Sequence, residues 1–241
     1  MEELRLEEHL GELRKRLIII LVFFVLSFAG AFAFVPNVYD WIVETAGQQL
    51  AILGPSDILW IYFTLAGSCA LIITTPLILY QLWKFVEPAI TAEEKGIVGV
   101  YIPAVFLFFI IGILFGYFIL FPSVLAFLQT LAEDHLVMMY TAERYFGFLF
   151  NLTIPIGLLF EIPILIILLT RLGLLNPARL AKTRKIAYFV LTLLATLVTP
   201  PDLISALIVL APLALLYEMS ISISKVVYKR RLARLEAVSE T

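Results

Sequence analysis

One carboxylate, Glu161, stands alone in a long apolar segment. The run from Leu152 to Leu169 holds no other ionisable residue. It lies within the 26-residue segment from Tyr145 to Thr170, which is long enough to cross a hydrocarbon core of about 30 Å. Because an ionised side chain at mid-depth costs at least about 2.5 kcal/mol, we expect Glu161 to face protein or water and not lipid. Two interpretations stay open: a structural polar contact with neighbouring helices, or a water-accessible site linked to transport.

Two further carboxylates, Glu12 and Glu94, lie next to apolar segments and each has a local structural explanation. The stretch before the first apolar run carries leucines spaced four, three and four apart, at Leu6, Leu10, Leu13 and Leu17. This spacing predicts one apolar stripe of a helix lying at the membrane interface. Glu12 and Arg16 are four apart, the spacing of a helical ion pair. Glu94 stands three residues after Thr91, the pattern of a capping box.

Composition places the chain in the membrane class. Hydrophobic residues make up 62% of it and its mean hydropathy is +1.02, against about 45–50% apolar residues in soluble domains. The single cysteine, Cys69, excludes a disulfide framework, and His9 and His135 are too far apart in sequence to suggest a metal site. No P-loop, HExxH or GxSxG string occurs. We therefore expect no enzyme, no metal, no cofactor and no nucleic-acid partner.

Six membrane-spanning segments can be drawn in one membrane domain that covers residues 1–241. They are Leu17–Val35, Ile58–Tyr80, Ile97–Leu120, Tyr145–Thr170, Ile186–Thr199 and Leu203–Tyr217. The last two hold only 14 and 15 residues, too few to span an undeformed bilayer. The string TPPD at 199–202 cannot continue a helix, so it predicts a tight turn in a short final hairpin. The expected fold is an all-α, concave helical bundle.

The basic residues predict the orientation. If both termini share one side with the second and fourth connections, that side holds 16 of the 17 Lys and Arg residues, and only Arg144 falls opposite. The positive-inside rule makes that side cytoplasmic. Residues 225–241 then form a basic cytoplasmic tail, and the chain is a multi-pass protein of the cytoplasmic (inner) membrane. On the other side we expect the connection from Pro36 to Asp57 to be a partly ordered cap.

Five local strings, taken in order, resemble one known family. They are HLGELRKR at 9–16, QLWKFVEPAI at 81–90, FP at 121–122, FEIP at 160–163 and TPPD at 199–202. With six spans and both ends inside, the set closely resembles TatC, the receptor subunit of the twin-arginine protein translocase, over nearly the whole chain.

The resemblance implies the function and the site residues. The family binds signal peptides with two consecutive arginines on folded cargo, and it gathers TatA-like and TatB-like single-span subunits for export driven by the proton-motive force. Its signal-binding carboxylates match Glu12 and Glu94, with Phe85 and Pro88 beside them, and its mid-membrane polar residue matches Glu161. A carboxylate can receive a planar guanidinium bidentately, whereas lysine lacks that geometry. The role of Glu87, an added carboxylate before Pro88, stays open.

Partner subunits are expected at the final hairpin, with Thr196 and Ala206 as contact positions. The alternative function is a secondary transporter with Glu161 as its proton or cation site, but no internal repeat supports it. An intramembrane hydrolase lacks a catalytic set, because Glu161 has no His, Asp or metal-ligand partner in its own span. The string Gly112-Ile-Leu-Phe-Gly116 predicts close helix packing.

Overall fold

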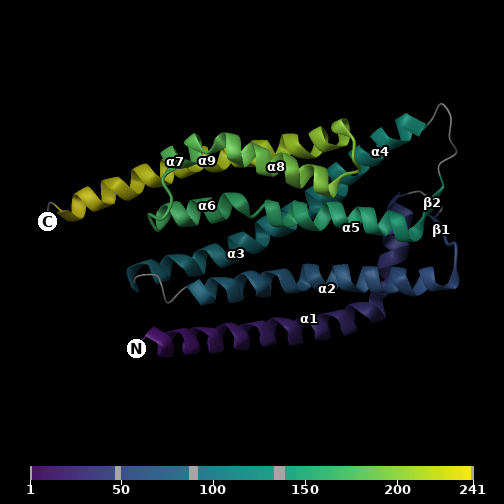
Figure 1. Cartoon of the computed structure of the whole chain (residues 1–241), viewed down its shortest axis with the longest axis horizontal. Coiled ribbons are helices and arrows are strands. Elements are labelled where there is room, and N and C mark those ends of the chain that lie inside the picture. Colours follow the sequence, from purple (N-terminus) through teal and green to yellow (C-terminus); the bar gives the residue numbers. More distant parts are fainter. Residues whose placement is uncertain (1, 47–49, 87–91, 133–138, 240–241) are drawn as a thin grey trace. The chain divides into compact units, whose positions relative to one another are not determined.

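The computed structural model is almost entirely helical, as the sequence predicts. It describes the backbone of all residues except 1, 47–49, 87–91, 133–138 and 240–241, and the side chains of residues 11–45, 50–82, 84, 103–131 and 139–233. The helices, labelled in Figure 1, are α1 (Glu2–Ala46), α2 (Pro55–Val86), α3 (Ala92–Phe115), the π-helix η2 (Gly116–Leu120), α4 (Phe121–Ala132), α5 (Ala142–Leu159), α6 (Ile162–Arg171), α7 (Pro177–Lys182), α8 (Arg184–Val198) and α9 (Leu203–Ser239).

Internal contacts divide the chain into two units. Unit 1 comprises residues 1–95 and 137–150, and unit 2 comprises residues 96–136 and 151–241. The described residues include one small parallel sheet, in which β1 (Leu50–Ala51) pairs with β2 (Tyr140–Thr141) inside unit 1.

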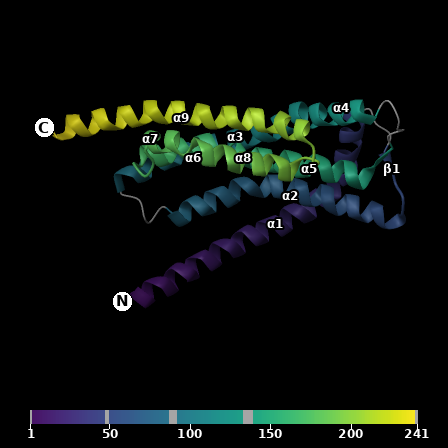
Figure 2. The same cartoon turned by 45° about the horizontal axis from the view of Figure 1, so that its top comes forward.

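Unit 1 is built on the pairing of α1 with α2, which lie side by side in Figures 1 and 2. Aromatic rings fill much of the contact. The ring of Phe28 stacks on Phe63 with centroids 5.9 Å apart, and the ring of Phe32 lies 5.7 Å from that of Tyr62. Such pairs add about 0.5–1.5 kcal/mol each beyond the area they bury.

The first helix is longer than the sequence predicts. We expected the span to end at Val35, but α1 continues through Pro36 to Ala46 and bends in its last part (Figure 1). A proline removes one helical hydrogen bond and kinks a helix without always ending it. The connection expected between Pro36 and Asp57 is therefore helical as far as Ala46, and its role as a cap stays a prediction.

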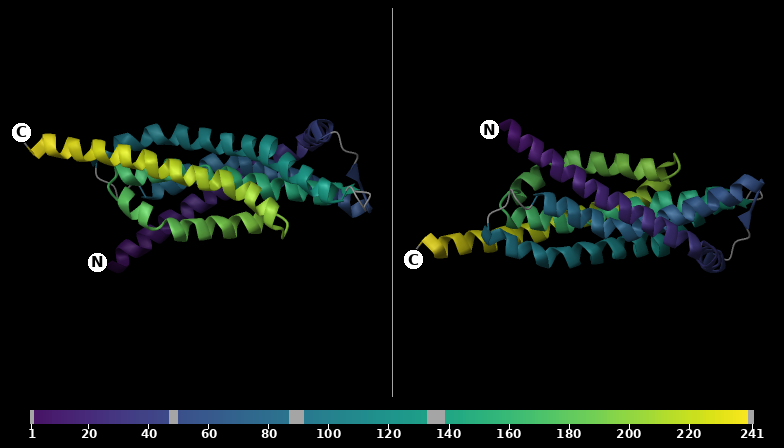
Figure 3. Two further views of the ribbon diagram at one scale, coloured as in Figure 1. Left: turned by 90° about the horizontal axis from the view of Figure 1, so that it is seen from above. Right: turned by 90° about the horizontal axis from the view of Figure 1, so that it is seen from below.

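Unit 2 is organised around the last helix. The helices α8 and α9 form a hairpin, and α6 packs on α9 (Figure 3). A buried hydroxyl pair, Thr170 and Ser224, joins α6 to α9 at 2.7 Å. The predicted turn at 199–202 is present: the Asp202 N–H donates to the Pro200 carbonyl at 2.7 Å, and the Asp202 carboxylate accepts from the Ser205 N–H at 2.6 Å, capping α9.

The helix lengths suit a multi-pass membrane protein. Five helical segments among the described residues are long and apolar enough to cross a membrane: Gly11–Thr45, Pro55–Leu82, Pro103–Leu131, Ala142–Arg171 and Leu203–Ala233. The expected fifth span corresponds to α8, whose 15 residues reach only about 22 Å. The sixth differs from the expectation, because α9 does not end at Tyr217. No proline or glycine follows Pro212, so nothing stops the helix before Ser239.

Close packing between α3 and α5 depends on glycine, as the small-residue string predicts. A Cβ built on Gly112 would lie 2.7 Å from the Phe160 Cβ and 2.8 Å from the Gly157 Cα. One built on Gly116 would lie 3.1 Å from the Thr153 Cα. At Gly112 the backbones are therefore so close that a methyl group cannot enter without movement.

Gly112→Ala should lower thermal stability in detergent, because overpacking a tight contact costs about 1–3 kcal/mol. Gly147→Ala is the matched control, since its Cβ would meet nothing within 4 Å and alanine favours a helix. Melting temperatures of the two variants check this. Equal melting temperatures of both variants would show that α3 and α5 can move apart at Gly112 with little loss of stability.

Candidate functional site

Glu12 lies on α1 where this helix meets the end of α2. Its carboxylate pairs with the guanidinium of Arg16, so the ion pair expected from their spacing is present. Arg16 also reaches α2: Nη1 donates to the Gln81 amide oxygen at 3.1 Å, and Nη2 donates to the Lys84 carbonyl at 3.1 Å. Glu12 is thus joined through Arg16 to the last turn of α2.

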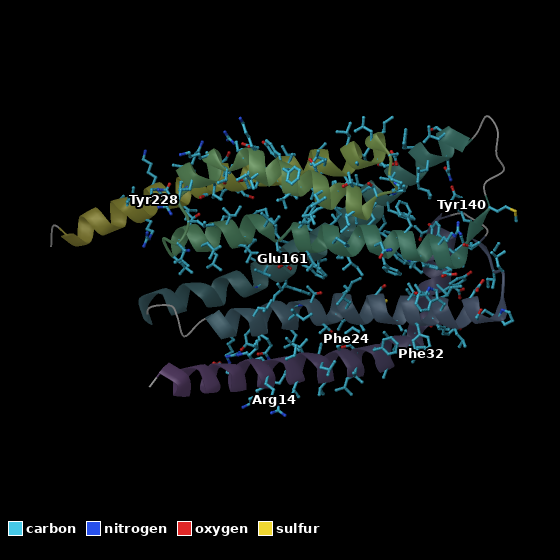
Figure 4. The ribbon with its side chains drawn as sticks, viewed as in Figure 1. Arg14, Phe24, Phe32, Tyr140, Glu161 and Tyr228 are labelled. Atoms are coloured by element: carbon cyan, nitrogen blue, oxygen red, sulfur yellow. The ribbon has the colours of Figure 1, made fainter. Side chains whose placement is uncertain are left out.

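The two partners differ in exposure. The side chain of Arg16 is 14% exposed, whereas that of Glu12 is 36% exposed. Gln81, which bonds Arg16, is buried. Arg14, two residues before Arg16, extends from the side of α1 that faces away from α2 (Figure 4). Glu12 therefore offers a partly exposed carboxylate that already holds one guanidinium.

The other predicted signal-binding residues are only partly placed. The helix α3 begins at Ala92, the position that a capping residue at Thr91 requires, and Glu94 lies in its first turn. The backbone of Phe85 belongs to α2. The side chains of Glu94 and Phe85, and the whole of Pro88 and Glu87, lie outside the described residues. Their convergence on Glu12 stays a prediction.

Glu161 lies at a break in the fourth apolar segment (Figure 4). Pro163 has no N–H to donate to the Leu159 carbonyl, so α5 ends at Leu159 and α6 starts at Ile162. Between them the Glu161 N–H donates to the Leu158 carbonyl at 3.2 Å, and the Glu161 carbonyl accepts from the Leu165 N–H at 3.0 Å. The string FEIP at 160–163 contains the proline that causes the break, whereas the predicted span Tyr145–Thr170 was unbroken.

The carboxylate of Glu161 is buried inside unit 2. The residue is 2% exposed, and its Oε1 finds no hydrogen-bond donor in the described part of the chain. Thr153, eight residues earlier, also has a buried hydroxyl without a described partner. A buried polar atom left unpaired costs about 1–3 kcal/mol, and more when it is charged.

The two expected partner-contact positions differ in exposure. Thr196 on α8 is exposed, and its hydroxyl bonds its own helix at the Leu193 carbonyl, 2.9 Å away. Ala206 on α9 is only 6% exposed, whereas its neighbour Leu207 is 51% exposed. A partner that packs on α9 near these residues would therefore contact Leu207 and not Ala206.

One polar cluster, at the start of α8, was not predicted from the sequence. Glu218 on α9 accepts from the Tyr188 hydroxyl at 2.6 Å and from the Arg184 guanidinium at 2.8 Å. Glu218 is the only carboxylate in the sequence between Asp202 and Glu236, which could have marked it. The cluster joins α8 to α9 in the hairpin. A 3.0 Å bond from the Tyr217 hydroxyl to the Leu180 carbonyl joins α9 to α7.

Comparisons with known proteins agree with the resemblance carried by the five strings. The family model described as Sec-independent protein translocase protein (TatC) matches residues 8–212. Among curated proteins, the chain is 49% identical over 231 residues to TatCd of Bacillus subtilis (strain 168), covering 96% of both chains. It is 41% identical over 234 residues to TatCy of the same organism, covering 95% of this chain and 92% of that one.

Solved structures give the same result. Two crystal structures described as the twin arginine translocase receptor TatC match with TM-scores of 0.79 and 0.81, each at 32% identity. They cover 91% and 90% of this chain and 99% of their own. Family model, curated relatives and solved structures thus agree over most of the sequence, and the resemblance is confirmed. The chain belongs to the TatC family of Sec-independent protein translocase proteins.

Proposed function

We propose that this chain is the receptor subunit of a twin-arginine translocase in the cytoplasmic membrane. In this proposal Glu12 and Glu94 bind the paired arginines of a signal peptide on folded cargo at the cytoplasmic face, where both termini lie. TatA-like and TatB-like single-span subunits then join, and the proton-motive force drives export. Because the chain is a translocase component, the alternative of a small-solute transporter is set aside.

The pairing of Glu12 with Arg16 is the observation that carries this proposal. The carboxylate is partly exposed and already receives a guanidinium, the group that a signal arginine would present. A second support is the likeness to crystal structures described as the twin arginine translocase receptor. The contribution of Glu94 rests on the family resemblance and on its place in the first turn of α3.

Glu12→Ala and Glu94→Ala should each weaken binding of a twin-arginine peptide about ten-fold or more, because a hydrogen bond to a charged group is worth roughly 1.5–3 kcal/mol. Glu→Gln should be nearly as harmful, since the amide loses the charge and one acceptor. Fluorescence polarisation with detergent-purified protein measures the affinity, and a peptide with both arginines changed to lysine reports the background.

Glu44→Ala is the control for this experiment, because Glu44 is an exposed carboxylate on the same helix as Glu12. Its affinity should equal that of the unmodified chain. Unchanged peptide affinity in both the Glu12 and the Glu94 variants would remove the central mechanism.

Partner subunits should be captured from the final hairpin. A photo-crosslinker at Thr196 on α8 or at Leu207 on α9 should trap a single-span subunit, because both positions are exposed and α8 is too short to cover a full bilayer thickness. A crosslinker at Ala206, which is buried, should give a weaker product. If crosslinked products form only from positions on α1 and α2, the final hairpin is not the surface that binds the partner subunit.

Glu161 should serve a step after peptide binding. Its buried, unpaired carboxylate oxygen needs a donor from water or from a partner's polar residue, so Glu161→Ala should impair transport or partner recruitment while largely preserving peptide affinity. Peptide affinity, melting temperature and transport are measured for Glu161→Ala and Glu161→Gln. A purely structural role gives another pattern, with Gln tolerated and Ala lowering melting temperature together with peptide binding.

A further inference from the structure

Arg16 is held on α2 by bonds that do not involve Glu12. The Gln81 amide oxygen and the Lys84 carbonyl each accept from its guanidinium at 3.1 Å. Gln81 is buried, and Arg16 is the less exposed member of its ion pair. If the Glu12 carboxylate moved away, two of the three described partners of Arg16 would remain in place.

Glu12 is in the opposite position. Its side chain is the more exposed partner, and Arg16 is the only group to which it bonds among the described side chains. A glutamate has several rotatable bonds, so the carboxylate can turn to another cation without moving either helix. Arg16 is therefore a fixed internal guanidinium, and Glu12 is a movable carboxylate.

A signal arginine that binds the carboxylate bidentately would need both oxygens, and Arg16 already occupies Oε1. It would also bring a positive charge close to the guanidinium of Arg16, and like charges at that distance repel. The pair must open, or share its carboxylate at a cost, before a peptide can bind. The apparent dissociation constant then equals the intrinsic one divided by the fraction of receptors whose carboxylate is free.

We propose that Arg16 is an internal competitor that occupies Glu12 in the empty receptor and is exchanged for a signal arginine. This inference rests on the proposed function of Glu12. Arg16 lowers the affinity of the site for every cationic segment by a similar factor. For ligands that hold the carboxylate weakly, such as lysine pairs, the apparent dissociation constant then rises above the available peptide concentration. Paired arginines still bind.

The sign of the effect separates competition from positioning. Removing a competitor raises peptide affinity, whereas removing a residue that only orients Glu12 lowers it. A partly exposed ion pair is worth about 0.2–1 kcal/mol, and the anchored guanidinium loses little side-chain freedom on pairing. We therefore expect the arginine peptide to bind roughly 1.5- to five-fold more tightly to Arg16→Gln and Arg16→Met, with a similar factor for the lysine peptide.

The test uses the full chain in detergent with twin-arginine and twin-lysine peptides. Lys15→Gln is the matched control, because it removes one exposed positive charge from the neighbouring position; its affinity should change less than that of Arg16→Gln. Arg16→Lys keeps the competing charge, so its affinity should stay near that of the unmodified chain. Melting temperatures of all variants show whether the contact between α1 and α2 survives.

A double-mutant cycle with Glu12→Gln separates this inference from the function on which it rests. If Arg16 acts through Glu12, the gain from Arg16→Gln disappears in the double variant. One outcome overturns the proposal that Arg16 is a competitor: peptide affinity in both Arg16→Gln and Arg16→Met equals or falls below that of the unmodified chain, while Glu12→Gln still weakens binding. The receptor proposal then stands. Full binding by Glu12→Gln alone overturns the role of Glu12 in peptide binding, on which this inference rests.

Discussion

The lack of water inside a bilayer is the constraint that shapes this chain. Backbone N–H and C=O groups must pair within the protein there, so the apolar segments are helices and each irregularity needs its own hydrogen bonds. The break at Glu161 meets this need with short-range bonds to Leu158 and Leu165, and the turn before α9 meets it with the Asp202 cap. Glu161 and Asp202 both stand at such irregular points, whereas the Thr170–Ser224 pair lies within regular helices.

Much of the fold was predictable because hydropathy and helix length are local properties. The apolar segments, the short α8 and the turn at 199–202 all follow from the sequence. Helix ends were harder to predict, because a proline such as Pro36 can be absorbed as a bend once neighbouring helices support it. The continuation of α9 beyond Tyr217 was missed because hydropathy marks where an apolar segment ends, and a helix can continue into polar sequence. The six-span count, the concave bundle and the orientation of the termini stay predictions.

In the candidate sites too, local features were predictable from the sequence and tertiary contacts were not. The spacing of Glu12 and Arg16 predicted their ion pair, but no pattern in the sequence indicates that Gln81 and Lys84 hold the same guanidinium, since those contacts are 65 and 68 residues apart. Likewise, Ala206 and Leu207 are both apolar, and only the packing of α9 decides which one is exposed. Sequence therefore identified Glu12 and Glu161, while tertiary contacts define the surroundings of each carboxylate.

The length of α9 bears on how this protein can be labelled. A helix of 37 residues measures about 55 Å, nearly twice the thickness of the hydrocarbon core. A fluorescent protein fused after it would be carried on a stiff rod instead of a loose tether. Its orientation would follow that of the hairpin, so polarised emission from such a fusion could report rotation of α8 and α9 during transport.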